Sequence, residues 1–276
     1  MKTYGQYITL NKNARGCYML DTIKGCQAGL ENNNGGCYGE CYATRAAKRF
    51  SYDFSKSIKR KAREGGGCQL YLPGFKNPKH LNRIIRQIYN INMPFVRIGD
   101  MGDPSEDWEH TIDICKKISP ANKPIVIVTK HWNDIPDYLL RDIERLGLYI
   151  NTSISALDSN EQILHRLYEY YRLKDVCNSV LRIVSCDFNK QNTEGVRLSK
   201  IQDELFKQGK IIDTVFRVRL NNPLVTEGII NIKKTRFLSS FCYASVYNRD
   251  TYFGNCKQCP DMCGTTMGND YGLQDN

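Results

Sequence analysis

The chain has 276 residues and a formal net charge of +10, with 41% hydrophobic and 25% charged residues. These proportions are typical of a globular protein with a substantial core, and no apolar run is long enough to form a membrane helix. The first residues lack the apolar run of a secretory signal, so we expect a cytoplasmic protein with no membrane partner. The positive charge fits a phosphate-bearing partner without selecting between nucleic acid and nucleotide.

The predicted elements begin with a strand over residues 17–23, which leads into a loop rich in glycine, asparagine and cysteine. A helix that includes residues 44–50 follows this loop. From about residue 92, short apolar runs alternate with amphipathic segments. The predicted strands are 93–100, 124–129, 148–153, 180–184 and 211–216, and the predicted helices are 105–118, 134–146, 160–172 and 199–208.

This alternation predicts right-handed crossovers and a parallel sheet that is buried on both faces. A doubly wound sheet and a partial or full parallel (β/α) barrel of the TIM type share the pattern. After about residue 237 the alternation stops. We therefore expect an α/β domain in residues 1–236 and a cysteine-rich, metal-binding appendage in residues 237–276.

Cysteine is frequent, with 12 residues in a chain that we expect in a reducing compartment. Disulfides rarely persist there, so thiols at short spacings indicate metal binding. Two groups lie near the ends of the chain: Cys17, Cys26, Cys37 and Cys41, and then Cys242, Cys256, Cys259 and Cys263. The scattered Cys68, Cys115, Cys177 and Cys186 are interpreted as small buried hydrophobic residues.

The first group lies on a loop between a predicted strand and a predicted helix. The best trio is Cys26, Cys37 and Cys41, and the glycines around them let the backbone wrap closely around a compact centre. Three thiolates at the carboxyl end of a strand can hold three irons of a [4Fe-4S] cluster and leave the fourth iron open. Zinc at the same thiolates, or no metal, are the alternatives.

Four short motifs follow one another along the chain. They are Cys-Tyr-Ala at 41–43, Gly-Asp-Met-Gly-Asp at 99–103, Val-Thr-Lys at 128–130 and Asn-Thr-Ser-Ile-Ser at 151–155. In this order they resemble the radical S-adenosylmethionine superfamily, most closely its spore photoproduct lyase-like and uncharacterised phage-associated members. The family spaces its cysteines Cys-x3-Cys-x2-Cys, whereas this chain has ten residues between Cys26 and Cys37 and carries Thr44 where a third cysteine would fall.

The resemblance implies a β/α barrel that binds a [4Fe-4S] cluster and S-adenosylmethionine. In such enzymes the reduced cluster cleaves the cofactor, and the resulting 5′-deoxyadenosyl radical abstracts a hydrogen from the substrate. A reductase, or a flavodoxin or ferredoxin, supplies the electron. The substrate and the bond that reacts do not follow from the resemblance.

Polar residues at the carboxyl ends of the predicted strands are the expected cofactor contacts. Asp100 and Asp103 would accept hydrogen bonds from the amine of S-adenosylmethionine, and Lys130 would pair with its carboxylate. Ser153 and Ser155 would hold the ribose or the carboxylate, and Arg182 is a further carboxylate candidate. Structural roles are the alternatives: Asp103 as a helix cap, Lys130 and Arg182 in ion pairs, and the serines bonded to the backbone.

The second group has the spacing Cys-x2-Cys-x3-Cys at Cys256, Cys259 and Cys263. Such tight spacing in a reducing compartment predicts a metal site, either a second iron–sulfur cluster or zinc. Cys242 lies upstream as the expected fourth ligand, and Cys17 or Cys68 can supply it through space instead.

A basic run between Arg45 and Arg63 is interleaved with aromatic residues, which suits phosphate contacts combined with stacking. It makes a nucleic acid or nucleotide a possible substrate of the radical enzyme, although a solvated helix face gives the same pattern. The alternative function is a cysteine-rich zinc protein that binds nucleic acid and performs no redox chemistry.

Overall fold

The computed structural model describes residues 7–23, 25–32, 35–51 and 75–267. Its centre is a nine-stranded sheet with the strand order β1-β2-β3-β4-β5-β6-β7-β9-β8. The strands are β1 Asn11–Lys12, β2 Tyr18–Leu20, β3 Val96–Ile98, β4 Ile125–Thr129, β5 Tyr149–Ile154, β6 Asn178–Ser185, β7 Ile211–Val218, β8 Lys233–Phe237 and β9 Ser240–Ser245.

Helices connect the parallel strands, and short 3₁₀ turns lie at several of their ends. The helices are α1 Gln27–Glu31, α2 Tyr42–Arg49, α4 Pro78–Tyr89, α5 Trp108–Ile118, α6 Asp137–Arg145, α7 Asn160–Leu173, α8 Thr193–Leu205 and α9 Pro223–Thr226. The predicted alternation of strands and helices from residue 92 onwards is confirmed.

Side-chain caps explain where several helices begin. The Asp107 carboxylate accepts a hydrogen bond from the backbone N–H of His110, so the predicted helix 105–118 divides into a 3₁₀ turn and α5. Ser159 and Gln162 form a reciprocal capping box at the start of α7. The Asn192 side chain caps Gly195, and α8 therefore begins before the predicted residue 199.

The sheet is open, with β2 to β7 parallel to one another. At one edge β1 pairs antiparallel to β2, and at the other β9 pairs antiparallel to β7 and β8. The protein thus has a mixed α/β fold with a mostly parallel sheet. The expected boundary after residue 236 falls within the β8–β9 hairpin, and Cys68 and most of the basic run lie outside the described residues.

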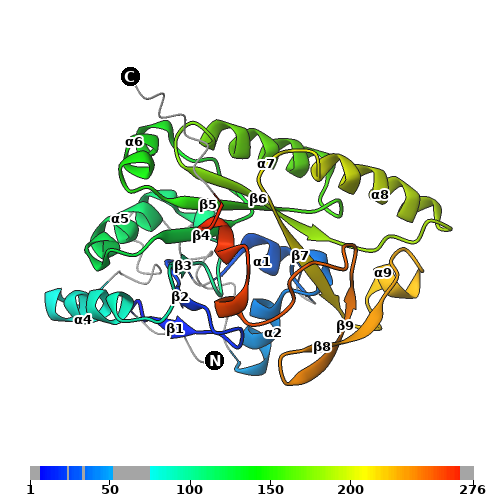
Figure 1. The fold of residues 1–276 in the computed structure, drawn as a ribbon, viewed down its shortest axis with the longest axis horizontal. Helices are drawn as coiled ribbons and strands as arrows, with labels where there is room; N and C mark the ends of the chain where they lie inside the picture. The colour runs from blue at the N-terminus through cyan, green and yellow to red at the C-terminus, as the bar shows by residue number, and fades with distance from the viewer. Residues whose placement is uncertain (1–6, 24, 33–34, 52–74, 268–276) are drawn as a thin grey trace.

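The apolar core lies between the strands and the helices that surround them. Figure 1 shows α4, α5, α6, α7 and α8 in an arc along the outside of the strands. Central strand β4 is almost entirely buried, as expected for a parallel strand covered on both faces. Cys115, Cys177 and Cys186 are buried in the core, as predicted. Within the described residues, no helix combines the length and apolarity that a bilayer crossing requires.

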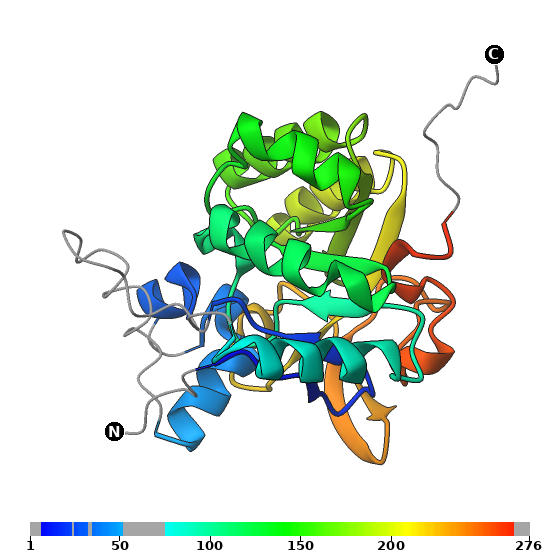
Figure 2. The ribbon, with the colours of Figure 1, turned by 90° about the vertical axis from the view of Figure 1, so that its left-hand side faces the viewer.

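Cys26, Cys37 and Cys41 lie on the opposite side of the molecule from Cys256, Cys259 and Cys263. Figure 2 shows α1 and α2, which flank the first group, on one side, and the red segment that carries Cys256 to Cys263 on the other. The loop containing the first group follows the carboxyl end of β2, whereas Cys17 precedes its amino end. Parallel α/β proteins bind their ligands at the carboxyl ends of the strands. A ligand site is therefore expected on the side of the sheet where the loop with Cys26, Cys37 and Cys41 lies.

Candidate functional site

Three cysteines of the first group, Cys26, Cys37 and Cys41, each lie at the start of a short helical element. Cys26 precedes α1, Cys37 begins a 3₁₀ turn, and Cys41 precedes α2. Burial and the neighbouring charges of Asp103 and Cys37 raise the pKa of Cys26. Burial also raises the pKa of Cys37 to about 11, with Cys41 adding to the shift and Lys130 opposing it. Cys37 thus lies within electrostatic reach of both other thiols.

Glycine is required where this loop folds back on itself. Gly36 has a φ of +63°, and a Cβ at this position would lie 2.4 Å from the Cβ of Cys41. At Gly35 a Cβ would lie 2.3 Å from the carbonyl oxygen of Gly39. A side chain at either position would push the segments carrying Cys37 and Cys41 apart, so the two glycines hold these thiols near one another.

Tyr38 ties the cysteine loop to the strands. Its hydroxyl donates a hydrogen bond to Asp158 Oδ1 at 2.6 Å, and the Lys130 ammonium donates to the same hydroxyl oxygen. The Lys130 nitrogen also lies 4.6 Å from the centre of the Tyr38 ring, in a cation–π contact. Lys130 follows β4 and Asp158 follows β5, so the loop is anchored to two adjacent strand ends.

Glu40 anchors the other side of the loop. Its carboxylate accepts hydrogen bonds from the backbone N–H of Arg219 at 3.0 Å, from the Arg219 side chain at 3.1 Å and from the Asn222 amide at 3.2 Å. Arg45 pairs with the same carboxylate at 2.8 Å. The Asn222 amide also donates to the carbonyl oxygen of Tyr38 at 2.9 Å. This buried carboxylate therefore fixes the loop between Cys37 and Cys41 to the segment that follows β7.

The loop after β3 packs against the first cysteine loop. A Cβ at Gly102 would lie 2.1 Å from the carbonyl oxygen of Ile23, so only glycine fits there. The Tyr42 hydroxyl donates to the carboxylate and the carbonyl oxygen of Asp100. Glu106 Oε1 accepts a hydrogen bond from the backbone N–H of Gln27 at 2.9 Å, immediately after Cys26.

Asp103 has a structural position within this loop. Its Oδ1 accepts hydrogen bonds from Ser105 N at 3.0 Å, Ser105 Oγ at 2.8 Å and Thr129 Oγ1 at 2.6 Å. Its Oδ2 accepts from the backbone N–H of Lys130 at 2.8 Å. Both carboxylate oxygens are therefore engaged, and Asp103 joins the loop after β3 to the end of β4. The helix-cap alternative for this residue is the one that its contacts match.

Lys130 belongs to a buried ion-pair network. Its ammonium lies 3.3 Å from Asp158 Oδ1, and Arg166 Nη1 lies 2.5 Å from Asp158 Oδ2. Burial alone would raise the pKa of Asp158, but the charges of Lys130 and Arg166 hold it below its usual value. Arg166 Nε also donates to the Lys130 carbonyl oxygen at 2.6 Å. The network holds Lys130 in place directly above the Tyr38 ring.

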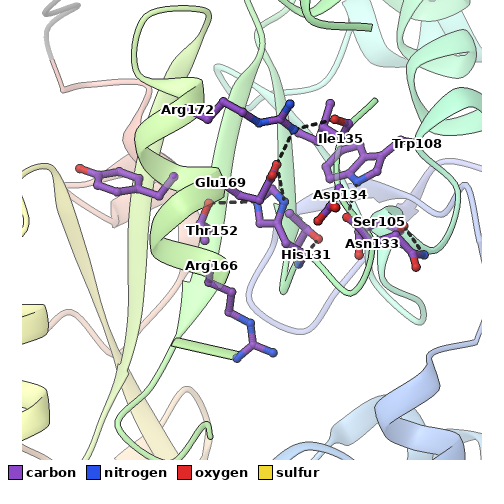
Figure 3. A network of polar contacts seen from close by, with 12 residues as sticks. Ser105, Trp108, His131, Asn133, Asp134, Ile135, Thr152, Arg166, Glu169 and Arg172 are labelled. Carbon is purple, nitrogen blue, oxygen red and sulfur yellow. Dashed lines mark hydrogen bonds and ion pairs between the residues drawn. The ribbon is translucent and has the colours of Figure 1, made fainter. Parts of the chain in front are cut away.

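A second buried network lies beside it, centred on His131 (Figure 3). His131 Nε2 is 3.0 Å from Thr152 Oγ1, and its ring packs against the indole of Trp108. Burial lowers the pKa of His131 to about 3, with His165, Arg166 and Arg172 nearby. The ring is therefore neutral at ordinary pH. On its other side, His131 Nδ1 lies 3.9 Å from the buried Glu169 carboxylate.

The predicted serines and Arg182 have different surroundings. Ser155 Oγ donates to the carbonyl oxygen of Val184 at 2.7 Å, so this hydroxyl joins β5 to β6. Ser153 lies opposite Arg182 in the register of these strands, and the two side chains share one face of the sheet. Arg182 donates to Asn151 Oδ1 at 3.1 Å and to Cys263 Sγ at 3.3 Å. Arg182 therefore lies beside the second group of cysteines.

That second group gathers around Cys17. Cys17 and Cys256 are buried in the same core cluster, and Cys263 packs against it. The neighbouring Cys17 thiol and the positive charges of Arg15 and Arg97 lower the pKa of Cys256, although burial opposes this shift.

Cys242, the expected fourth ligand, lies elsewhere. It lies on β9 and lines a separate cavity of about 500 Å³ with Glu40, Arg45 and Arg219. Of the three candidates for the fourth ligand, Cys17 is therefore the one that the described residues bring to Cys256, because Cys68 is outside them.

Among the described residues, no three His, Cys, Asp or Glu side chains converge on a point as a ready-made site for a single metal ion. No protein-family model, curated protein or solved structure matches this chain at significant similarity.

Proposed function

We propose that this protein is a radical S-adenosylmethionine enzyme whose [4Fe-4S] cluster is held by Cys26, Cys37 and Cys41 on a partial β/α barrel. The observation that supports this proposal most directly is the placement of these three thiols on one anchored loop. This loop follows β2 at the carboxyl side of six parallel strands. Open sheets of this kind bind their ligands at that side.

The chemistry of the residues around the loop fits such a cluster. Thiolates are the protein ligands of iron–sulfur clusters, and three of them leave one iron open for an exogenous ligand. Because each thiolate ligates a different iron, the sulfurs do not have to converge on a single ion. Thr44, one turn into α2, is buried with a hydroxyl oxygen that has no hydrogen-bond partner among the described residues. A hydroxyl here is suited to donate to a cluster sulfur, where hydrogen bonds tune the reduction potential.

The cluster and S-adenosylmethionine together supply the reductive cleavage that yields 5′-deoxyadenosine after hydrogen abstraction from the substrate. The chain's own residues bind and orient. In this proposal Asp100, which follows β3 and accepts a hydrogen bond from Tyr42, would accept hydrogen bonds from the methionine amine. Lys130, which pairs with Asp158, would also pair with the methionine carboxylate, and Ser153 would contact the ribose. Asp103 and Ser155 position the loops that carry these groups.

The proposed partners are a reductase, or a flavodoxin or ferredoxin, as electron donor, and a nucleic acid or nucleotide as substrate. The support for a polyanionic substrate is the net charge of +10 and the exposed Lys48 and Arg49 at the end of α2. These two residues follow the cysteine loop directly, and the basic run continues beyond them into residues outside the described part. A salt titration of DNA and RNA binding tests this substrate class, and no affinity at low salt would exclude it.

The test of the activity is anaerobic incubation with S-adenosylmethionine and a strong reductant, followed by quantification of 5′-deoxyadenosine. We expect wild-type protein to form it and Cys26→Ala, Cys37→Ala and Cys41→Ala to lose at least 100-fold in rate. Cys115→Ala is the matched control, because this cysteine is buried on α5 in a core cluster that includes no residue of the cysteine loop. The folded fraction of this variant should have wild-type activity.

Two outcomes would overturn the proposal. One is 5′-deoxyadenosine formation that survives all three substitutions. The other is a colourless anaerobic protein that contains zinc and no iron or sulfide, and this result would support the zinc-dependent nucleic-acid-binding alternative.

A further inference from the structure

Independently of the proposed activity, we infer that Cys17, Cys256, Cys259 and Cys263 form a four-thiolate metal centre at the amino side of the sheet. The centre would take a thiophilic metal, either zinc or an iron–sulfur cluster, and would fasten the chain's last described segment to the strands.

The segment that carries three of these cysteines is already bound to the start of β2. The backbone N–H of Cys256 donates to the Arg15 carbonyl oxygen at 2.7 Å, and Arg15 Nε donates to the Gly254 carbonyl oxygen at 2.8 Å. Gly16 has a φ of +81° and packs against the Asn255 side chain, where a Cβ would lie 3.1 Å from the amide oxygen. These contacts bring Cys256 into the buried cluster that also contains Cys17.

The other end of the segment is held in an unusual backbone conformation. Met262, Cys263 and Gly264 have consecutive positive φ values of 43°, 56° and 91°. A non-glycine residue in this region costs about 1 kcal/mol or more and persists where its surroundings demand it. The Asn151 amide donates to the Cys263 carbonyl oxygen at 3.0 Å. A Cβ at Gly264 would lie 2.6 Å from a methyl of Val180, so the turn is pressed directly onto the sheet.

The charge of the surroundings fits a thiolate–metal complex. The segment and the sheet enclose a cavity of about 100 Å³, lined by Cys256, Cys259 and Cys263. Its charged lining consists of four arginines, Arg15, Arg97, Arg182 and Arg217, and two aspartates, Asp213 and Asp261, which leaves a net charge of +2. Among the described residues, neither Arg97 nor Arg182 has a carboxylate within ion-pair distance.

Four thiolates around one divalent ion carry a net charge of −2, and so do four thiolates around a [4Fe-4S] cluster in its 2+ state. Either complex would neutralise the cavity lining. Four neutral thiols would leave the net charge of +2 in the cavity lining uncompensated, and four bare thiolates would repel one another. The hydrogen bond from Arg182 Nη2 to Cys263 Sγ at 3.3 Å is the contact expected of a cation beside a metal thiolate.

The position of the centre suggests what it does for the fold. Cys17 precedes β2, and Cys263 is held against Asn151 of β5 and Arg182 of β6. A metal bound by Cys17 and the three later cysteines would therefore join the first parallel strand to the middle of the sheet. Metal-binding free energy at such a site adds to the stability of the folded state.

The test uses full-length protein in which Cys26, Cys37 and Cys41 are all replaced by alanine, so that metal at the other site does not contribute. Iron, zinc and acid-labile sulfide per chain are measured after anaerobic purification. We expect about one zinc, or about four irons with matching sulfide, per chain. Zinc without sulfide identifies the single-ion form, and iron with sulfide identifies the cluster.

Adding Cys259→Ala or Cys263→Ala to this background should reduce the bound metal at least tenfold, and both residues lie on the segment after β9, outside the strands of the sheet. Cys17→Ala should do the same, whereas Cys242→Ala is the matched control and should retain the metal. The inference is overturned if the triple-alanine protein contains less than about one-tenth of a metal equivalent per chain. It is also overturned if the Cys17→Ala variant keeps its metal, or if the Cys242→Ala variant loses it. Iron that disappears only with Cys26, Cys37 and Cys41 would leave the proposed activity intact while excluding this second centre.

Discussion

The two groups of cysteines differ in how the chain assembles them. The carboxyl-side group comes from one loop between Cys26 and Cys41, and carboxylates at Glu40, Asp158 and Glu106 anchor that loop or its flanks. The amino-side group joins Cys17 to a segment more than 230 residues later in the chain, and its charged surroundings are mainly arginines. The first site is built from residues close in sequence and is anchored by carboxylates. The second is built from residues distant in sequence and has mainly positively charged surroundings.

This difference indicates different roles. Anchors on three sides keep the loop with Cys37 and Cys41 in place beside the polar ends of β4 and β5. The arginines around the second group compensate charge at a centre that joins distant parts of the chain. Four predictions test whether the scaffold at the carboxyl side works as its contacts indicate, and we take them from the largest effect to the smallest.

Replacement of Arg166 should have the largest effect. Arg166→Met leaves the buried Asp158 carboxylate without its 2.5 Å partner, so we expect a loss of about 4 kcal/mol in the free energy of unfolding. Urea denaturation measures it. Arg197→Met is the matched control, because it breaks an exposed pair with Glu194 and should cost about 0.5 kcal/mol. Equal losses in the two variants would show that the Asp158 network does not stabilise this side of the protein.

Glu40→Ala should have the second-largest effect on stability. It removes the carboxylate acceptor that Arg219, Arg45 and Asn222 share. Hydrogen bonds to a charged group contribute about 1.5 to 3 kcal/mol each, but the two arginine side chains are partly exposed and can bind water instead. We therefore expect a loss of about 3 kcal/mol in the free energy of unfolding. The same variant should lose iron at the first site and keep metal at the second. Metal analysis of both sites is the readout, and loss of the second metal alone would contradict the assignment.

His131 should make stability depend on pH. Its pKa is about 3 in the folded protein and about 6.5 when exposed, so below pH 6.5 the unfolded chain takes up a proton that the folded protein does not. Its contribution to stability is therefore complete above pH 6.5 and is lost as the pH falls towards 3, at about 1.4 kcal/mol per pH unit. Between pH 7 and pH 5 we expect a decrease of about 2 kcal/mol.

Urea denaturation at several pH values measures this slope. His131→Asn is the informative variant, because asparagine tolerates the positive φ of 47° at this position and does not titrate. The slope of wild type minus that of the variant isolates the imidazole from other groups. Identical slopes would mean that the buried ring takes up a proton as readily as an exposed one.

Thr44→Val should have the smallest effect on stability, and it should also change the reduction potential of the proposed cluster. Removing a buried hydroxyl without a partner should stabilise the fold by about 1 kcal/mol or leave it unchanged. If the hydroxyl donates to the proposed cluster, the variant should also have a lower cluster reduction potential, while Thr44→Ser keeps the wild-type value. A valine variant that matches wild type in potential would remove Thr44 from the proposed site.

The alternation of strands and helices was predictable because buried parallel strands and amphipathic helices leave a regular hydrophobic pattern. The antiparallel edges were not, because β1 has only two residues and the pairing of β9 with β7 leaves no mark in periodicity. The placement of Cys26, Cys37 and Cys41 between β2 and α2 was predictable, because they are close in sequence. The approach of Cys17 to Cys256 depends on the register of distant segments, which is why Cys242 was the expected fourth ligand.

The anchoring residues left little local signal. Arg166 has the spacing of an ordinary polar residue on a helix, yet it is buried with Asp158. Tyr38 and Glu40 lie between two cysteines, and no other feature of the sequence predicts a role for them. The double role of Asp103, by contrast, was foreseeable, because an aspartate two residues before a serine at a helix start is a common cap. Residues that act through contacts distant in sequence are those that the pattern alone does not reveal.

The central claim is that Cys26, Cys37 and Cys41 hold an iron–sulfur cluster, and iron with acid-labile sulfide per chain tests it most directly. Anaerobically purified wild-type protein should contain about four more irons and four more sulfides than the variant in which all three cysteines are alanine. Equal iron and sulfide in the two proteins would contradict the claim.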